Sequence, residues 1–275
     1  MMNLFEVNEK TCLQDGICAQ ICPVRVIEFR EGACPRPADE AEEICIGCGH
    51  CVAVCPTGSL NHRLVPLEQC PPIEDDLRIS GRAAAQFLRS RRSLRVYEDR
   101  KVPRRDLQRL VELACYAPSG HNSQGAKWLI LGRKDMRGLA EMVVDWMRRV
   151  IGQSPQMAAS MHLERTVQRW QEGEDVVLRN APALIIAHAP AEDRFAPGTC
   201  TIALSYLELA ATTLGLGTCW AGYFNAAATT YPPLTAALGL PVGHQAFGSM
   251  MVGYPAFTYQ RLPCRNPPEI TWRLS

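Results

Sequence analysis

The feature that most constrains this 275-residue chain is a run of four cysteines, Cys45, Cys48, Cys51 and Cys55, followed directly by Pro56. A second copy, reading CLQDGICAQICP, ends at Pro23 and carries Asp15 where the second cysteine is expected. Several thiols within one short loop bring metal ligands together without any long-range folding. The two runs therefore indicate paired metal centres near the N-terminus.

The spacing resembles the cysteine runs of bacterial ferredoxins, which hold 4Fe–4S clusters. In those proteins three cysteines of one run bind one cube, and the fourth binds the other cluster. The resemblance implies a two-cluster ferredoxin-like domain at residues 1–66. The implied ligands of one cluster are Cys22, Cys45, Cys48 and Cys51. Those of the other are Cys12, Asp15, Cys18 and Cys55, and that cluster is either 4Fe–4S or, if Asp15 binds weakly, 3Fe–4S.

Two other interpretations of the cysteines fit less well. Zinc sites usually end in two CxxC pairs or in histidines, and neither run has that form. Disulfides require an exported protein, but the N-terminus MMNLFEVNEK has an early acidic residue and no apolar signal segment. We therefore expect a cytoplasmic protein with reduced thiols. The cysteines outside the runs are expected not to be ligands: Cys34, Cys70, Cys115, Cys200, Cys219 and Cys264.

Charge and hydrophobicity exclude two classes of partner. The formal net charge is +1, which predicts no bulk attraction to nucleic acid or to an acidic membrane surface. The longest apolar stretch, residues 200–217, contains Glu208 and is shorter than the roughly 20 residues that span a bilayer. Prolines and acidic residues gather between residues 66 and 76. We therefore predict a linker at residues 67–80 and a second domain at residues 81–275.

Hydrophobic periodicity in the second domain predicts helices at 81–92, 103–116, 136–150, 156–170 and 201–214. It predicts strands at 128–132, 183–189, 218–224 and 246–252, the first of them buried. Helices and strands mix without regular βαβ alternation. The predicted class is therefore α+β.

Three places in this domain carry candidate chemistry. Arg91, Arg92 and Arg95 surround Ser93 at a helix end, where guanidinium groups can bind a phosphate; the alternative is a solvated charged helix end. The loop APSGHNSQ at 117–124 can approach a flat heterocycle, or it is an ordinary polar connection. The glycine-flanked segment 215–224 can lie against a ring, or it is a core strand.

In this order, and with a C-terminal Gly-Tyr-Pro followed by arginines, these elements resemble the FMN-dependent nitroreductase family from about residue 81 onward. The resemblance implies an intertwined homodimer in which both chains contribute to each FMN site. It implies phosphate and ribityl contacts from Arg91, Arg92, Ser93, Arg95 and Arg265. It also implies flavin contacts from Pro118, Ser119, Asn122, Gln124, Gly222 and Tyr223.

Together the two resemblances imply a small ferredoxin-like iron–sulfur domain followed by a nitroreductase-like FMN domain. The predicted function is an oxidoreductase that passes electrons from a low-potential donor through two clusters to FMN. Its predicted acceptor is a nitro-aromatic, quinone-like or other conjugated small molecule. The donor is either a ferredoxin or NAD(P)H, although no GxGxxG motif follows a strand to bind a nicotinamide cofactor separately. The alternative function is a non-catalytic electron carrier or redox sensor.

Overall fold

A computed structural model describes residues 3–274 and divides the chain into two compact units. The first unit extends to Arg78 and includes the short segment Gly120–Ser123. The second comprises Ile79–Ser119 and the chain from Gln124 onward. None of the helices within residues 3–274 has the length and apolarity needed to cross a membrane.

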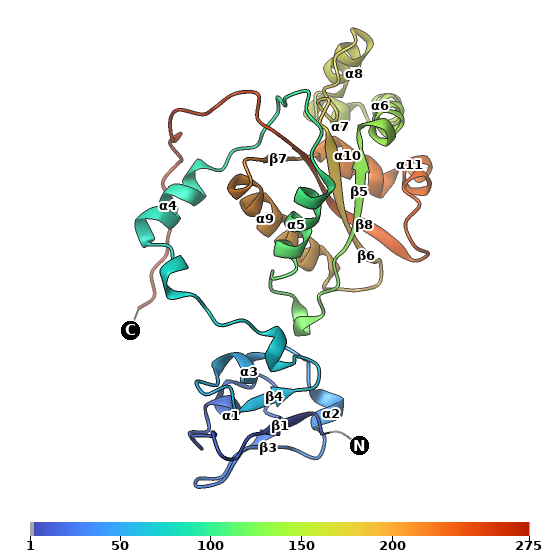
Figure 1. The fold of residues 1–275 in the computed structure, drawn as a ribbon. Coiled ribbons are helices and arrows are strands. Elements are labelled where there is room, and N and C mark those ends of the chain that lie inside the picture. The colour runs from blue at the N-terminus through green and yellow to red at the C-terminus, as the bar shows by residue number, and fades with distance from the viewer. Residues whose placement is uncertain (1–2, 275) are drawn as a thin grey trace. The chain divides into compact units, whose positions relative to one another are not determined.

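The first unit is built from short elements around two small antiparallel sheets (Figure 1). Its strands are β1 (Phe5–Val7), β2 (Ile27–Glu28), β3 (Arg36–Pro37) and β4 (Leu60–His62). Its helices are α1 (Ile17–Ile21), α2 (Ala41–Ile44) and α3 (His50–Val54), followed by the 3-10 turns η1 (Leu67–Gln69) and η2 (Asp75–Leu77). Strand β1 pairs with β4, and β2 pairs with β3. The core of this unit is small, with eight buried apolar residues in its cluster.

The two cysteine runs fold in the same way. Gly16 and Gly49, each in the left-handed conformation with φ of 69° and 71°, precede α1 and α3. A Cβ atom at Gly16 would lie 2.6 Å from the Phe29 ring, so the position requires glycine for space as well as for backbone angle. Each helix ends at the last cysteine of its run, Cys22 or Cys55, which is extended. Both runs therefore place their last cysteine in extended backbone just beyond a short helix.

The second unit contains a four-stranded antiparallel sheet with strand order β5-β6-β8-β7 (Figure 1). Its strands are β5 (Lys127–Gly132), β6 (Ala183–Pro190), β7 (Gly217–Trp220) and β8 (His244–Gly253). Its helices are α4 (Gly81–Ser90), α5 (Arg104–Ala114), α6 (Arg133–Gln153), α7 (Pro155–Ser160), α8 (Leu163–Gln171), α9 (Ala196–Thr213), α10 (Gly222–Thr230) and α11 (Pro232–Ala237). The mixture of helices with an antiparallel sheet confirms the α+β class.

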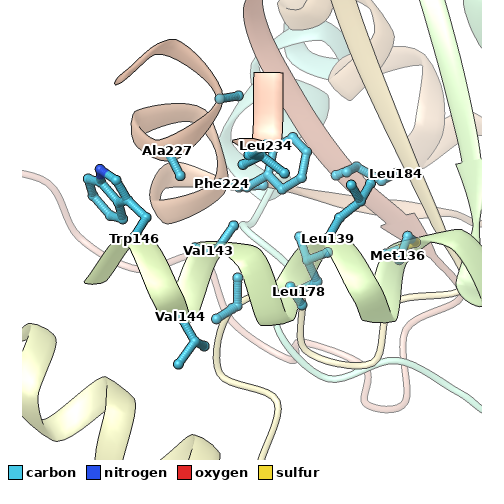
Figure 2. Packing of buried hydrophobic residues seen from close by; sticks show 14 of the residues in the cluster. Met136, Leu139, Val143, Val144, Trp146, Leu178, Leu184, Phe224, Ala227 and Leu234 are labelled. Carbon is cyan, nitrogen blue, oxygen red and sulfur yellow. The ribbon is translucent and has the colours of Figure 1, made fainter. Parts of the chain in front are cut away.

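Helices cover both faces of this sheet, so its central strands are apolar on both sides. Leu184 and Ile186 of β6 join a cluster with α6, α8, α10 and α11. Ile185, between them, points the other way into a cluster with α5 and α9. Figure 2 shows the first cluster, with Val143 of α6 near Phe224 of α10. Burying a side chain of this size contributes about 1.5–3 kcal/mol, so the two clusters determine which helices dock on each face.

The elements differ from the sequence predictions in three places. Strand β5 is partly exposed rather than buried, because it forms the edge of the sheet. The helix predicted at 156–170 is two helices, separated where His162 has a φ of 54°. The strand predicted to reach Phe224 ends at Trp220, and α10 begins at Gly222.

Candidate functional site

One cavity of the first unit collects four thiols from both cysteine runs. Its lining includes Cys45, Cys48 and Cys51 of the second run and Cys22 of the first, and we call it the Cys48 cavity. Apolar side chains such as Val26 and Ile46 complete the wall. Burial raises the pKa of the Cys51 thiol to about 12 in the absence of any metal charge. A bound cation reverses that penalty, because metal coordination deprotonates a thiol.

A second cavity of the same unit collects the complementary set. Its lining includes Cys12, Asp15 and Cys18 of the first run and Cys55 of the second, and we call it the Asp15 cavity. Burial alone raises the pKa of Cys55, but hydrogen bonds from Thr57, Leu60 and Ser59 outweigh it and lower that pKa. The Ser59 amide donates to Cys55 Sγ at 3.2 Å. These donors suit a sulfur that carries negative charge.

The two cavities thus bring together the same two sets of four residues that the crossed ligation scheme predicts. Four thiols, or three thiols and a carboxylate, fit iron–sulfur clusters, which cysteine thiolates hold. No group of three His, Cys, Asp or Glu side chains within residues 3–274 is arranged to bind a metal ion. In a cube each cysteine binds a different iron, so its ligands do not need to converge on one point.

Asp15 itself is exposed and is tied to its own loop. Its Oδ1 accepts a hydrogen bond from the Ile17 amide at 3.2 Å, near the start of α1. Cys34, which the sequence analysis set aside, lies close by, since Gln14 Nε2 is 3.9 Å from its sulfur. Burial and a contact with Cys12 raise the pKa of the Cys34 thiol.

The predicted phosphate-binding arginines follow the end of α4 in the second unit. Arg91 and Arg265 line one cavity of about 360 Å³, together with Leu88, Arg89, Pro263 and Cys264. Arg91 also forms an ion pair with Glu208 of α9 at 3.1 Å. Arg92 and Ser93 are half-buried, and Arg95 is exposed. Arg91 and Arg265 therefore line the same cavity, and Arg91 has a carboxylate partner that the sequence analysis did not identify.

The predicted flavin loop has an unusual backbone. His121, Asn122 and Gln124 have positive φ values of 51°, 52° and 46°. Non-glycine residues rarely adopt this conformation, and clusters of them occur at ligand-binding sites. The Gln124 amide donates to Ser119 Oγ at 3.0 Å, which closes the loop on itself.

Residues on either side of this turn have different neighbours. Ser119 and Gln124 line a cavity of about 310 Å³ with Lys127, Trp128 and Thr199. Trp128 Nε1 is buried and has no hydrogen-bond acceptor among the described residues. A ligand with an acceptor atom in this cavity fits that donor.

Asn122 belongs to the first unit, where its Nδ2 donates to the carbonyls of Ile46 and Gly47 at 3.2 and 3.0 Å. Pro118 is exposed just before the turn.

Gly222 and Tyr223 form the first turn of α10 instead of the strand end that the sequence predicted. The first amides of a helix have no intrahelical acceptor, so this backbone can donate hydrogen bonds to a ligand. The Tyr223 hydroxyl donates to the Met161 carbonyl at 3.0 Å and is 3.3 Å from Thr166 Oγ1. Its phenol therefore fastens α10 to the α7–α8 region.

Comparison with known proteins gives two matches to family models. The model described as the nitroreductase family matches residues 88–254. The model described as a 4Fe-4S binding domain matches residues 41–61, which contain the second cysteine run. A protein of Archaeoglobus fulgidus, provisionally named an NADH dehydrogenase/NAD(P)H nitroreductase, is 25% identical over 175 residues. That match covers 62% of this chain and 84% of the relative.

Solved structures share the fold of the second unit. A nitroreductase with bound FMN from Bacteroides fragilis is 22% identical with a TM-score of 0.54, covering 68% of this chain and 97% of its own. A BluB-like flavoprotein from Clostridium difficile is 17% identical with a TM-score of 0.55, covering 67% of this chain and 94% of its own. A nitroreductase with bound FMN from Desulfitobacterium hafniense is 22% identical with a TM-score of 0.54, covering 68% and 96%.

Proposed function

Because this chain belongs to the nitroreductase family and carries a 4Fe-4S motif, we propose that it is an FMN enzyme supplied with electrons by two iron–sulfur clusters of its own. The electrons come from a low-potential donor and reduce a nitro-aromatic, quinone-like or other conjugated small molecule. The first unit acts as the entry for single electrons, and the second unit carries out the reduction.

The two cavities with crossed donor sets are the observation that carries this proposal. Each combines three side chains of one run with one cysteine of the other. A zinc site or a pair of disulfides has no need of that interleaving, whereas two clusters with crossed ligation require it. The matched 4Fe-4S model covers only the second run, so the cluster near Asp15 is part of the proposal.

In the second unit, the chain's residues bind and orient the flavin. When bound, FMN supplies the redox chemistry, since it takes up single electrons and delivers two. The proposed roles follow the geometry: Arg91 and Arg265 hold the phosphate in the cavity they share. Ser119, Gln124 and Trp128 Nε1 contact the ligand from the cavity that they line, and the first amides of α10 donate hydrogen bonds to it. No protein nucleophile is required.

The donor is proposed to be a ferredoxin-type protein, because fused clusters are redundant if hydride arrives directly. The name of the Archaeoglobus fulgidus relative mentions NADH and NAD(P)H, which makes a nicotinamide the second candidate donor. Rapid reduction of the flavin by NADH or NADPH in a cluster-free variant would favour the nicotinamide.

Anaerobic purification followed by iron, sulfide and flavin analysis tests the proposal. We expect one FMN and about eight irons per chain, the content of two complete cubes. The rival function, a non-catalytic carrier or redox sensor, predicts the same content but no turnover. Stopped-flow oxidation of the reduced protein by a quinone or nitro-aromatic separates the two, because a carrier reacts slowly with small acceptors. A preparation that holds neither flavin nor iron would contradict both.

The proposal also predicts a homodimer. If two chains contribute to each FMN site, as the family resemblance implies, a single chain cannot form a complete site. Sedimentation analysis of the FMN-loaded protein should give about twice the 30.5 kDa chain mass. A monomer that retains one FMN per chain would contradict this expectation.

A further inference from the structure

His62 lies inside the Cys48 cavity but belongs to neither cysteine run. It is the last residue of β4, is only 3% exposed, and lines the cavity together with all four thiols. Strand pairing places it opposite Phe5 of β1, and the two rings stack with centroids 6.5 Å apart. A buried histidine in a paired strand, with its ring stacked on Phe5, has little freedom to turn that ring.

Two contacts determine which ring nitrogen carries the proton. The Leu64 amide donates to His62 Nδ1 at 3.1 Å, so Nδ1 is an acceptor without a proton. A neutral imidazole with an unprotonated Nδ1 has its hydrogen on Nε2. Nε2 lies 3.5 Å from Cys45 Sγ. His62 therefore donates an N–H···S hydrogen bond to Cys45.

No histidine occupies the equivalent strand position in the Asp15 cavity. The same pair of strands passes both cavities, and at the other end Val7 of β1 lies opposite Leu60 of β4. Val7 and Leu60 line the Asp15 cavity, and its described lining contains no histidine. The two sites therefore differ at this strand position as well as at Asp15.

We propose that His62 is a positioning residue that raises the reduction potential of the cluster in the Cys48 cavity. The inference rests on the proposed function, because it assumes that Cys45 binds iron. A reduced cluster is more negative than an oxidised one, so a hydrogen bond to its sulfur stabilises the reduced form more. The effect acts on the cluster in the Cys48 cavity, because His62 lines that cavity and not the Asp15 cavity.

Redox titration of the full-length protein, monitored by electron paramagnetic resonance, tests the proposal. Three variants are compared with wild type: His62→Leu removes the donor at similar volume, and His62→Gln replaces it with an amide N–H. Thr57→Val is the matched control, because Thr57 Oγ1 is 3.7 Å from Cys55 Sγ in the other cavity. Iron and sulfide analysis of each variant shows that both clusters are present.

At fixed poise we expect His62→Leu to lower the reduced-to-oxidised ratio of one cluster about tenfold, which is 59 mV for a one-electron couple. His62→Gln should restore most of that ratio. Thr57→Val should leave the reduction potential of this cluster unchanged. Wild-type potentials in a cluster-replete His62→Leu protein would overturn the proposal, as would a His62→Gln protein that behaves like His62→Leu. Wild-type protein without iron and sulfide would instead overturn the proposed function on which the inference rests.

Discussion

Asp15 is the residue at which the two cysteine runs differ most. A carboxylate is a harder ligand than a thiolate and suits iron–sulfur chemistry less well. Its Oδ1 already accepts a hydrogen bond from the Ile17 amide, which competes with binding to iron. We therefore expect Asp15→Cys to hold its cluster more firmly in air. Electron paramagnetic resonance after brief exposure to air should show a 3Fe–4S signal in wild type and none in the variant.

Asp15→Ala distinguishes a weak ligand from a carboxylate that points to solvent. If Asp15 binds iron, the alanine variant should lose iron faster than wild type. If a water or hydroxide fills that corner instead, wild type and Asp15→Ala should lose iron at the same rate. Equal persistence of all irons in wild type and Asp15→Cys would show that the weak corner does not exist.

The contacts of Arg91 lead to a second prediction at the residue scale, on FMN binding. It lines the cavity that it shares with Arg265 and is paired with Glu208, which also accepts from Thr218 Oγ1 at 3.3 Å. A charge-assisted contact to phosphate is worth about 1.5–3 kcal/mol. Arg91→Ala should therefore raise the dissociation constant for FMN about 10-fold to 100-fold. Titration of the apoprotein with FMN measures this constant, and flavin release during dialysis checks it.

Glu208→Gln controls for the ion pair, since it removes the carboxylate charge but keeps the side-chain shape. If Arg91 holds phosphate, Glu208→Gln should retain FMN much better than Arg91→Ala. Arg95→Ala tests the exposed end of the same cluster. Unchanged FMN content in both arginine variants would contradict the phosphate assignment.

At the scale of elements, His188 of β6 is buried beside His244 of β8, and this contact makes the second unit sensitive to acid. His188 Nδ1 is 3.0 Å from His244 Nδ1, and His188 is 6% exposed. Burial, His244 and Lys127 all lower the pKa of His188. The unfolded chain, with a histidine pKa of about 6.5, then binds more protons than the folded one. The stability that comes from the lowered pKa of His188 is fully present above the unfolded pKa, and it is lost as the pH falls through the folded pKa of His188.

Urea unfolding at pH 7.5 and 5.5 checks this expectation. Tryptophan fluorescence reports the second unit alone, because all five tryptophans lie within it: Trp128, Trp146, Trp170, Trp220 and Trp272. Wild type should lose more stability than His188→Gln between the two pH values. An equal loss in both proteins would assign the acid sensitivity to other groups.

Sequence periodicity predicted helices and strands well where the apolar pattern lies within the element itself. It failed where the place of the element in the fold determines its burial or its bounds. The helix at 103–116 and the strand at 246–252 were found within two residues, because their apolar faces are continuous. Strand β5 reads as buried by composition, but its place at the sheet edge leaves Ile130 39% exposed. The start of α10 was missed because Trp220 to Phe224 continues an apolar stretch without any helix-capping residue.

At the scale of the whole molecule, candidate cluster ligands could be predicted from the sequence because each run is contiguous and the run repeats. The role of His62 could not be predicted from the sequence, since its position in the Cys48 cavity depends on the register between β1 and β4. Glu208 was noted only as a polar interruption of an apolar helix, and its pairing with Arg91 spans 117 residues. Long-range pairs of this kind leave no mark in spacing or periodicity.

The division of the chain into two units makes the electron route testable by removing one of them. The second unit has its own sheet and two apolar clusters, so it should fold without the first. Deleting residues 1–66 should abolish reduction of FMN by a reduced ferredoxin but leave reduction by dithionite intact. A full-length protein with Cys45→Ser and Cys48→Ser should behave in the same way, which separates loss of a cluster from loss of the unit. Equal ferredoxin-driven rates in truncated and full-length protein, followed as bleaching of the flavin absorbance, would show that electrons do not enter through the clusters.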